Sequence, residues 1–398
     1  MAKKEKEEKL DFGSLSAKEK QKMVNKALES LDEFSDQCSW LEDAQSNVTS
    51  FEDTGCYILN ALLSGELNGG FPEGRMSVLA AESSVGKSFI GIQAAALAQK
   101  KGKTVLIFDS EYAIDKDFAR NLGLDPKRTK YFPVRTIEQC KNAIYKFLNV
   151  VISNNMQGQF FVLVDSLANM IAEIEMNRAE KDKAATDMGT RARSMKSFLQ
   201  MCITMSGQSN TTIVCTNHIY DNPNAMFPSL VKPMPGGKCV TYLPSTILQL
   251  SAVNVKEDDD RKIDEEATAG GKGLLGKAVT GMSVKNRICK PFVKADMFIS
   301  WKNGLSKYYG LLELSQEFGL LFNKAGRFYL ASNPEKMVGT RKTLISDAEF
   351  WEGFMPTLQE AIDKNWKYSS PAEREAGEKK LENEIDKVED VYEDESEE

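Results

Sequence analysis

The chain has 398 residues, of which 41% are hydrophobic, so it is long enough for a large core with one or two small appended domains. It contains no apolar run of roughly 18 residues and no apolar segment after its charged start, so we expect a cytoplasmic protein, neither membrane-spanning nor secreted. Seven scattered cysteines without a Cys-x-x-Cys pair indicate reduced thiols, and the single histidine, His218, excludes a metal site built from several histidines.

The charge is concentrated at one end of the chain. Residues 371–398 carry 13 Asp and Glu against 4 Lys and Arg, a balance of −9, whereas the other 370 residues have a balance of +2. A segment of this composition is too polar to pack, so we expect a disordered acidic tail. The near-neutral body is compatible with a nucleic-acid partner, although the net charge of −7 for the whole chain argues against one.

Residues 1–35 are rich in Lys and Glu and show helical spacing from about Ser16 to Leu31, which predicts an arm or a packing helix. From about residue 51, predicted strands alternate with helices, the pattern of a parallel sheet and therefore of an α/β fold. We expect strands at residues 76–80, 104–108, 160–164 and 212–216, with a later group near 245–251 and 282–288. The first four are short and apolar, as expected for strands covered on both faces.

The segment from Arg75 to Ile90 reads RMSVLAAESSVGKSFI, a short strand followed by Gly-Lys-Ser and a helix over about 87–100. This is the P-loop pattern, in which backbone N–H groups and Lys87 bind phosphates, the Ser88 hydroxyl coordinates Mg²⁺, and the helix directs its positive end at the phosphates. Ala81 stands where the first Gly of the motif is usual, which implies a different entry to the loop or local strain. The predicted nucleotide-binding residues of this segment are Glu82, Ser83, Ser84, Val85, Gly86, Lys87, Ser88 and Phe89.

Polar residues follow each of the first four predicted strands. They are the loop 81–88, Asp109-Ser-Glu111, Asp165-Ser166 and Asn217-His218. Because ligands of parallel sheets bind outside the carboxyl ends of the strands, we expect these residues to converge on one site. Asp165 occupies the position that holds the Mg²⁺ shell in P-loop enzymes, or alternatively caps a helix over residues 166–171.

Two of these side chains are candidates for chemistry. Glu111 is expected to orient or activate the water that attacks the γ-phosphate, whereas in the alternative Glu111 or Asp109 simply caps the next helix. His218 follows a buried strand and precedes the longest Pro- and Gly-rich segment, so we predict that it reports the γ-phosphate to that segment. The alternative is a structural histidine with satisfied hydrogen bonds.

Two segments without regular periodicity, residues 172–187 and 219–238, are expected to be long irregular loops, which are usually functional or disordered. In the second, Phe227 either stacks on bases or folds back onto the core. Near the first, six cations favour contact with a nucleic-acid backbone or, alternatively, form a solvated face. These cations are Arg178, Lys181, Lys183, Arg191, Arg193 and Lys196.

The predicted division of the chain has four parts. Residues 1–50 form an N-terminal arm or oligomerisation segment, and residues 51–301 form the ATPase core that carries both loops. A small C-terminal α/β domain follows over residues 302–370, and the acidic tail ends the chain. Within the core, residues 254–273 are expected to form a charged surface insertion, a solvated hairpin or loop.

Taken in order, these motifs resemble the RecA family of recombinases, and more closely the UvsX-type recombinases of T4-like bacteriophages. The matching blocks are LSGELNGG at 63–70, DSEYAID at 109–115, FARNLG at 118–123, VDS at 164–166, DMG at 187–189, NH at 217–218, VKNRI at 284–288, YG at 309–310 and KAG at 324–326. The likeness covers roughly residues 51–365 and implies a RecA-type P-loop core with ATP and Mg²⁺ as cofactors.

The resemblance implies a DNA-dependent ATPase that forms a helical filament on single-stranded DNA, with ATP between subunits. Such a filament promotes homologous pairing and strand exchange with duplex DNA. The implied partners are a single-strand-binding protein and a mediator protein, with no membrane, in the host-cell cytoplasm if the protein is phage-encoded. The alternative is a hexameric DNA helicase of the same fold, against which the VKNRI block and the C-terminal domain argue.

The resemblance also assigns roles by matching position. The implied catalytic residues are Glu111 for water activation, Lys87, His218 as the γ-phosphate sensor, and Lys285 and Arg287, which reach the phosphates of the neighbouring subunit. Phe118 is assigned to stacking on adenine, and Ser88 and Asp165 to Mg²⁺. The implied DNA-binding residues of the two loops are Arg178, Arg193, Phe227, Gly236, Gly237 and Lys238. Tyr220 and Asp221 depart from the pattern, because bacterial members carry basic residues there.

Overall fold

The computed structural model describes residues 16–32, 41, 48–179, 189–221, 230–256, 274–369 and 374. It divides the chain into two compact units, residues 1–47 and 48–398. Several features predicted above lie outside the described residues. They are Phe227, Lys181, Lys183, residues 257–273 of the expected insertion, and the expected tail apart from Arg374.

The first unit contains helix α1 (Ala17–Asp32), close to the predicted span. Its start is stabilised by a reciprocal cap, in which the Ser16 hydroxyl donates to Glu19 Oε2 (2.6 Å) and the Glu19 N–H donates back to Ser16 Oγ (3.4 Å). Met23 and Val24 on this helix are exposed. The local sequence is therefore sufficient to explain where the helix begins.

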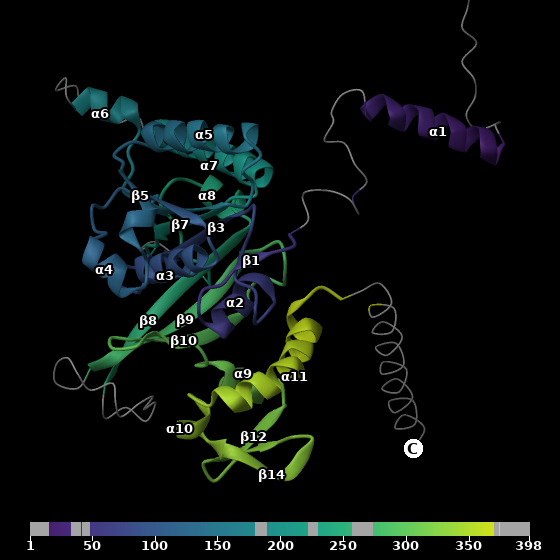
Figure 1. Cartoon of the computed structure of the whole chain (residues 1–398), viewed down its shortest axis with the longest axis vertical. Coiled ribbons are helices and arrows are strands. Elements are labelled where there is room, and N and C mark those ends of the chain that lie inside the picture. The colour runs from purple at the N-terminus through teal and green to yellow at the C-terminus, as the bar shows by residue number, and fades with distance from the viewer. Residues whose placement is uncertain are drawn as a thin grey trace, which may run out of the picture. The chain divides into compact units, whose positions relative to one another are not determined.

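In the described part of the second unit, most of the large sheet is parallel (Figure 1). The parallel strands are β3 (Met76–Ala81), β4 (Thr104–Asp109), β5 (Thr129–Pro133), β6 (Phe160–Asp165), β7 (Thr212–His218) and β8 (Thr246–Lys256). Antiparallel strands extend one edge: β9 (Leu274–Asn286), β10 (Lys294–Ser300) and β11 (Gly304–Leu305). The order is β11-β10-β9-β8-β3-β7-β6-β4-β5, which confirms the predicted α/β fold with a mostly parallel sheet.

The observed strands differ from the predicted ones mainly at their ends. The first four extend one or two residues further, to Ala81, Asp109, Asp165 and His218, because the neighbouring strand pairs with these residues, as Asp165 does with Asp109. β8 runs to Lys256, so the first residues of the expected charged insertion are strand. β5 and β10 were not predicted, because β5 is mostly exposed at the edge and the pattern of β10 is mixed.

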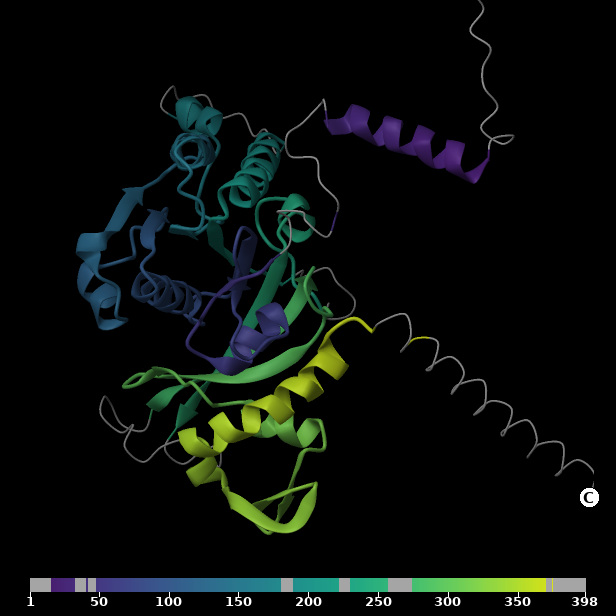
Figure 2. The same cartoon turned by 45° about the vertical axis from the view of Figure 1, so that its right-hand side comes forward.

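Helices cover both faces of the sheet (Figure 2). One face packs against α5 (Ile137–Ser153) and α7 (Thr190–Ser209). The other packs against α2 (Tyr57–Ser64) and α3 (Lys87–Lys100). Side chains of β4 alternate between the two cores, as the strand period requires, with Leu106 on the first side and Ile107 on the second. No helix of the described ranges is long and apolar enough to cross a membrane.

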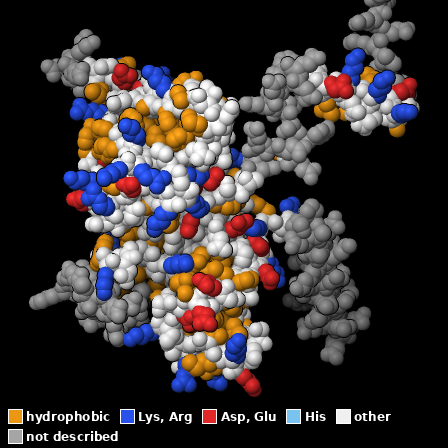
Figure 3. All heavy atoms as spheres, viewed as in Figure 1, with side chains coloured by type: hydrophobic (Ala, Val, Ile, Leu, Met, Phe, Trp, Pro, Cys, Tyr) orange, Lys and Arg blue, Asp and Glu red, His pale blue; other side chains and the backbone are white. Residues whose placement is uncertain are grey.

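The smaller elements lie around this sheet. They are β1 (Phe51–Glu52), β2 (Phe71–Pro72), α4 (Lys116–Asn121), the 3₁₀ helix η3 (Pro126–Arg128), α6 (Glu173–Ala179) and α8 (Cys239–Tyr242). Lys and Arg side chains gather on the surface over α4 and β5 (Figure 3). The exposed cations of these segments include Lys116, Arg120, Lys127, Arg128, Lys130 and Arg135. Charges beside an edge strand discourage indiscriminate strand pairing.

The C-terminal elements share a core with the sheet. They are α9 (Leu311–Glu317), β12 (Leu321–Lys324), β13 (Arg327–Leu330), β14 (Asn333–Thr340), α10 (Arg341–Leu344) and α11 (Ala348–Trp366). Trp351 and Leu358 of α11 belong to the same buried cluster as Leu62 of α2. Gln359 adds two hydrogen bonds, to the Gly65 carbonyl (2.9 Å) and from the Leu67 N–H (2.8 Å). The domain boundary at residues 301/302 stays a prediction.

Trp351 provides a test of this shared core. It is fully buried, and its Nε1 donates to the Leu344 carbonyl (2.6 Å). Trp351→Ala should lower the free energy of unfolding by about 3–5 kcal/mol, because it leaves a cavity and a carbonyl without its donor. The control Tyr368→Ala changes an exposed ring and should cost about 0.5 kcal/mol or less in urea denaturation. A two-step transition in which only the C-terminal elements lose stability would contradict a single core.

Candidate functional site

The loop predicted to bind phosphate connects the end of β3 with the start of α3. Positive φ angles fall at Ser84 (62°) and Gly86 (118°), and a Cβ atom at Gly86 would lie 2.6 Å from Ile299 Cδ1, so this position requires glycine. Ala81 is the last residue of β3 and pairs with His218 of β7. Ala81 itself is regular strand without backbone strain, and the left-handed conformations of the loop lie at Ser84 and Gly86.

Lys87 is held inside this loop by backbone carbonyls. Its Nζ donates to the carbonyl oxygens of Ala81 (3.1 Å) and Glu82 (2.8 Å), and the side chain is buried. Burial lowers the pKa of Lys87, and the carboxylates of Glu111 and Asp165 partly offset this effect. A partly desolvated ammonium group at this position is suited to binding an anion such as a phosphate.

Asp165 is buried at the end of β6. Its Oδ1 accepts a hydrogen bond from the Thr216 hydroxyl, and its Oδ2 has no hydrogen-bond partner within the described ranges. Burial raises the pKa of Asp165, the Ser88 and Thr216 hydroxyls lower it, and the charges of Glu111 and Asp109 raise it further. Residues 166–171 form a turn and not a helix, so the alternative of a helix cap is wrong. The open oxygen and the neighbouring hydroxyl suit a hard cation such as Mg²⁺.

Asp109 and Glu111 have separate tasks. Asp109 is buried and accepts hydrogen bonds from the N–H groups of Glu111 (2.8 Å), Tyr112 (2.8 Å) and Ile114 (3.1 Å), and from the Tyr131 hydroxyl (3.1 Å). It therefore braces the turn after β4. The next helix, α4, is capped by Asp115, so neither Asp109 nor Glu111 has the alternative role of a helix cap.

The Glu111 carboxylate points to the ends of the neighbouring strands. Its Oε1 accepts a hydrogen bond from the Ser166 hydroxyl (2.7 Å) and lies 3.3 Å from His218 Nε2. The side chains of Glu111 and His218 are each 26% exposed, so both are reachable from solvent. The structure thus brings Glu111, His218, Asp165 and Lys87 together at one edge of the sheet.

His218 also begins the second predicted loop, residues 219–238. The N–H of Tyr220 donates to the Pro233 carbonyl (3.1 Å), and Asn217 Nδ2 donates to the Pro235 carbonyl (3.2 Å). These two bonds tie the beginning and the end of the loop together. The described residues of the loop, 219–221 and 230–238, contain no helix or strand, as predicted.

The first predicted loop, residues 172–187, is not irregular throughout. Residues Glu173–Ala179 form α6, with Arg178 in its last turn. A distant contact stabilises the start of this helix, since Glu138 Oε2 on α5 accepts a hydrogen bond from the Glu173 N–H (2.9 Å). Glu138 Oε1 also accepts from the Ser194 hydroxyl (2.5 Å) on α7, the helix that carries Arg193.

The glycine pair of the second loop packs against α7. Gly236 and Gly237 have φ angles of 104° and 85°. A Cβ atom at Gly236 would lie 2.8 Å from Val240 Cγ2, and one at Gly237 would lie 3.1 Å from the Ala192 Cβ. Lys238 follows at the start of α8. The end of the first predicted loop and the end of the second therefore both lie at the start of α7.

The remaining predicted nucleotide contacts differ in exposure. Phe118 on α4 is 38% exposed, and Glu82, Ser83 and Ser84 are exposed. The side chains of Val85 and Phe89 pack in the core beside α3. For Val85 and Phe89, a contact with phosphate is therefore limited to backbone N–H groups.

Lys285 and Arg287 lie away from the loop of their own chain that is predicted to bind nucleotide, residues 82–86 (called the nucleotide loop below). Lys285 pairs with Ile247, which is level with Val78, whereas the loop begins after Ala81. Lys285 Nζ donates to the Tyr242 carbonyl, which Arg287 Nη2 also approaches at 3.4 Å. Burial, together with the charge of Arg287, lowers the pKa of Lys285 to about 8.

Sequence reasoning missed several contacts of this site. Thr216 lies on the same face of β7 as His218, so strand alternation was a usable signal for it. No local sequence pattern predicts that Lys277 and Lys232 contact the nucleotide loop, Lys277 at Ser84 and Lys232 at Glu82. Lys277 Nζ donates to the Ser84 carbonyl, 193 positions away in sequence, and lies 5.8 Å from the Trp301 ring centroid.

Comparison with known proteins identifies the family. Residues 22–306 match the RecA N-terminal domain. A Protein RecA of Nocardioides sp. is 28% identical over 261 residues, which cover 66% of this chain and 68% of that protein. The recombination and repair protein of Enterobacteria phage T4 is 27% identical over 274 residues, which cover 68% of this chain and 65% of that protein. The domain match covers most of this chain, so the chain belongs to the RecA family.

Proposed function

We propose that this chain is an ATP-dependent recombination protein that forms a helical filament on single-stranded DNA and promotes strand exchange with homologous duplex DNA. Membership of the RecA family supports recombination as the function, as do the names of the relatives. The observation that carries the proposal is the 3.3 Å contact between Glu111 and His218. It joins a carboxylate beside the nucleotide loop to the root of the second loop, as coupling of ATP to DNA requires.

In this proposal Lys87 and the N–H groups of residues 82–89 bind the phosphates of ATP, and Phe118 stacks on adenine. Ser88 and Asp165 hold Mg²⁺, which is supported by the buried Asp165 oxygen without a hydrogen-bond partner in the described ranges. Bound Mg²⁺ neutralises charge on the phosphates during hydrolysis. Glu111 orients the attacking water, and the other groups at this edge leave its carboxylate accessible for that role.

The two loops bind single-stranded DNA from neighbouring positions in this proposal. Arg178, Arg193 and Lys238 contact the backbone, Gly236 and Gly237 shape the second loop, and Phe227 stacks on bases. Base pairing with the incoming duplex then reads the sequence, so the protein contacts mainly backbone and base faces. A single-strand-binding protein and a mediator protein complete the expected set of partners.

Negative-stain electron microscopy tests the proposal as a whole. With single-stranded DNA and a non-hydrolysable ATP analogue, the protein should form open helical filaments. Closed rings would instead favour the hexameric helicase. A gel-shift assay without any retardation of single-stranded DNA would exclude both functions.

Glu111 and Lys87 should differ in the step that they affect. Glu111→Gln should still bind ATP and DNA but hydrolyse ATP about 10²- to 10⁴-fold more slowly, because it loses only the group that positions water. Lys87→Ala should lose ATP binding as well, because it removes the phosphate cation. Asp117→Asn, a change at an exposed carboxylate on α4, is the control and should keep the parental rate. An unchanged rate in Glu111→Gln would refute the assignment.

His218 should transmit the nucleotide state to the second loop. His218→Ala should bind ATP normally yet lose most of the gain in affinity for single-stranded DNA that ATP produces, because that gain needs a contact that differs between the two states. Fluorescence anisotropy with and without the ATP analogue measures the gain. An equal gain in variant and parent would return His218 to a structural role.

Lys285 should act on the neighbouring subunit, because it lies away from its own nucleotide loop. Lys285→Ala should reduce the ATPase rate about 10³-fold. Mixing it with Lys87→Ala should restore part of the activity. At some subunit interfaces, the Lys285→Ala subunit then supplies an intact Lys87 and the Lys87→Ala subunit supplies an intact Lys285. Failure to restore any activity in co-assembled mixtures would contradict a shared site.

The low pKa of Lys285 adds a pH dependence. The Lys285 ammonium is charged at pH values below its pKa of about 8 and loses its charge as the pH rises above that value. Phosphates of a bound nucleotide would raise this pKa, because they favour the charged form. ATPase activity should therefore fall with rising pH, with a midpoint at or above pH 8. Lys285→Arg should remove this fall, because guanidinium stays charged. Identical pH profiles for parent and variant would rule out a role for this charge.

A further inference from the structure

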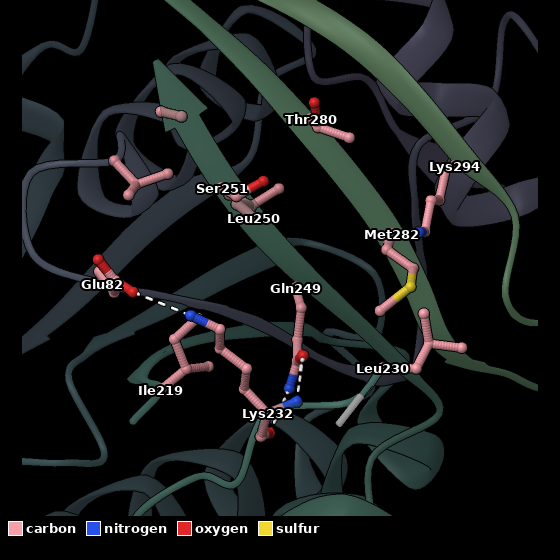
Figure 4. A pocket seen from close by; sticks show the side chains of 12 residues that line it. Glu82, Ile219, Leu230, Lys232, Gln249, Leu250, Ser251, Thr280, Met282 and Lys294 are labelled. Carbon is pink, nitrogen blue, oxygen red and sulfur yellow. Dashed lines mark hydrogen bonds and ion pairs between the residues drawn. The ribbon is translucent and has the colours of Figure 1, made fainter. Parts of the chain in front are cut away.

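A pair of ion contacts joins the nucleotide loop to both ends of the second loop. Lys232 Nζ lies 3.1 Å from Glu82 Oε1 and 3.0 Å from Asp221 Oδ1. Figure 4 shows Lys232 reaching across to Glu82. Glu82 is the first residue after β3, and Asp221 lies three residues after His218. Lys232 therefore bridges the nucleotide loop and the start of the second loop from the far end of that loop.

The backbone of Lys232 is fixed to the sheet. Its N–H donates to Gln249 Oε1 (3.0 Å), and Gln249 Nε2 donates to its carbonyl (2.7 Å), as drawn in Figure 4. Gln249 lies on β8 and is only 6% exposed. Two hydrogen bonds from one buried amide hold the main chain in place, so a change at Lys232 is confined to its long side chain.

Glu82 connects this lysine to Lys87. The Glu82 carbonyl accepts a hydrogen bond from Lys87 Nζ (2.8 Å), while the Glu82 carboxylate contacts Lys232. When phosphates bind Lys87, that ammonium exchanges a carbonyl partner for an anion, and the bound anion repels the nearby carboxylates. Lys232 is the cation that offsets this repulsion at Glu82 and Asp221.

We propose that Lys232 is a positioning residue that couples nucleotide binding to the second loop through Glu82. This inference rests on the proposed function and deepens it. ATP makes the contacts of Lys232 with Glu82 and Asp221 more favourable, which holds the start of the loop, at Asp221, against its fixed far end for DNA binding. Coupling free energies are reciprocal, so DNA bound at the loop also tightens ATP.

A cavity of about 390 Å³ lies beside the pair and gives the Lys232 side chain room to change partners. Leu230 and Met282 line it, and Lys294 on β10 lies across it from Glu82 (Figure 4). Lys294 offers a matched control, because it is a cation of the same cavity without an ion pair to Glu82 among the described contacts.

The test measures the affinity of the full chain for a labelled oligothymidine with and without a non-hydrolysable ATP analogue. Lys232→Gln should reduce the ATP-dependent gain about three- to fivefold, a modest factor because the ion pairs are exposed. Lys232→Arg should keep most of the gain, and Lys294→Gln should keep all of it. Thermal denaturation should show similar stability for all of these variants.

A double-mutant cycle decides whether Glu82 is the partner. Glu82→Gln should show a loss similar to that of Lys232→Gln, and the double variant should lose no more than either single variant. Additive losses, or a full gain in Lys232→Gln, would overturn the inference. If Lys232→Gln is unstable, a full gain in Glu82→Gln overturns it equally. Absence of any ATP-dependent gain in the parent would instead contradict the proposed function itself.

Discussion

The buried ammonium of Lys87 is the charge on which the carboxyl edge of the sheet depends. Asp109, Glu111 and Asp165 gather at the ends of β4 and β6, and burial, together with the negative charges of the other two, raises the pKa of Asp165. The positive charge of Lys87 offsets the repulsion among these carboxylates. Burial lowers the pKa of Lys87, whereas the charges of Glu111 and Asp165 raise it. Two backbone carbonyl oxygens, of Ala81 at the end of β3 and of Glu82 directly after it, set the position of the Lys87 ammonium.

Three chemically similar carboxylates perform different tasks because their hydrogen bonds differ. Asp109 accepts bonds from three N–H groups and a hydroxyl and has little capacity left for a ligand. Asp165 has one oxygen satisfied by Thr216 and one open within the described ranges. Glu111 reaches outward to His218. Asp109 therefore stabilises the turn after β4, whereas Asp165 and Glu111 keep acceptor capacity that a ligand could use.

Local sequence determined the main outline of this protein. The apolar runs before Ala81, Asp109, Asp165 and His218 predicted the central strands, because short segments buried on both faces must be apolar. The polar residues after these runs predicted the site, because parallel strands direct all their carboxyl ends to one edge. The Gly-Lys-Ser sequence predicted the loop between β3 and α3 in the same way, since the geometry of this loop depends on adjacent residues.

Tertiary structure alone decided the features that depend on distant partners. Helix α6 forms where the sequence predicted a loop, and its start is stabilised by a hydrogen bond to Glu138 on the distant helix α5. The bridge from Lys232 to Glu82 spans 150 positions, and no local pattern marks it. The distance of Lys285 from its own nucleotide loop follows from strand register. Periodicity along the chain reports which face of an element is buried, but partners across the fold are set by packing, which only the folded chain contains.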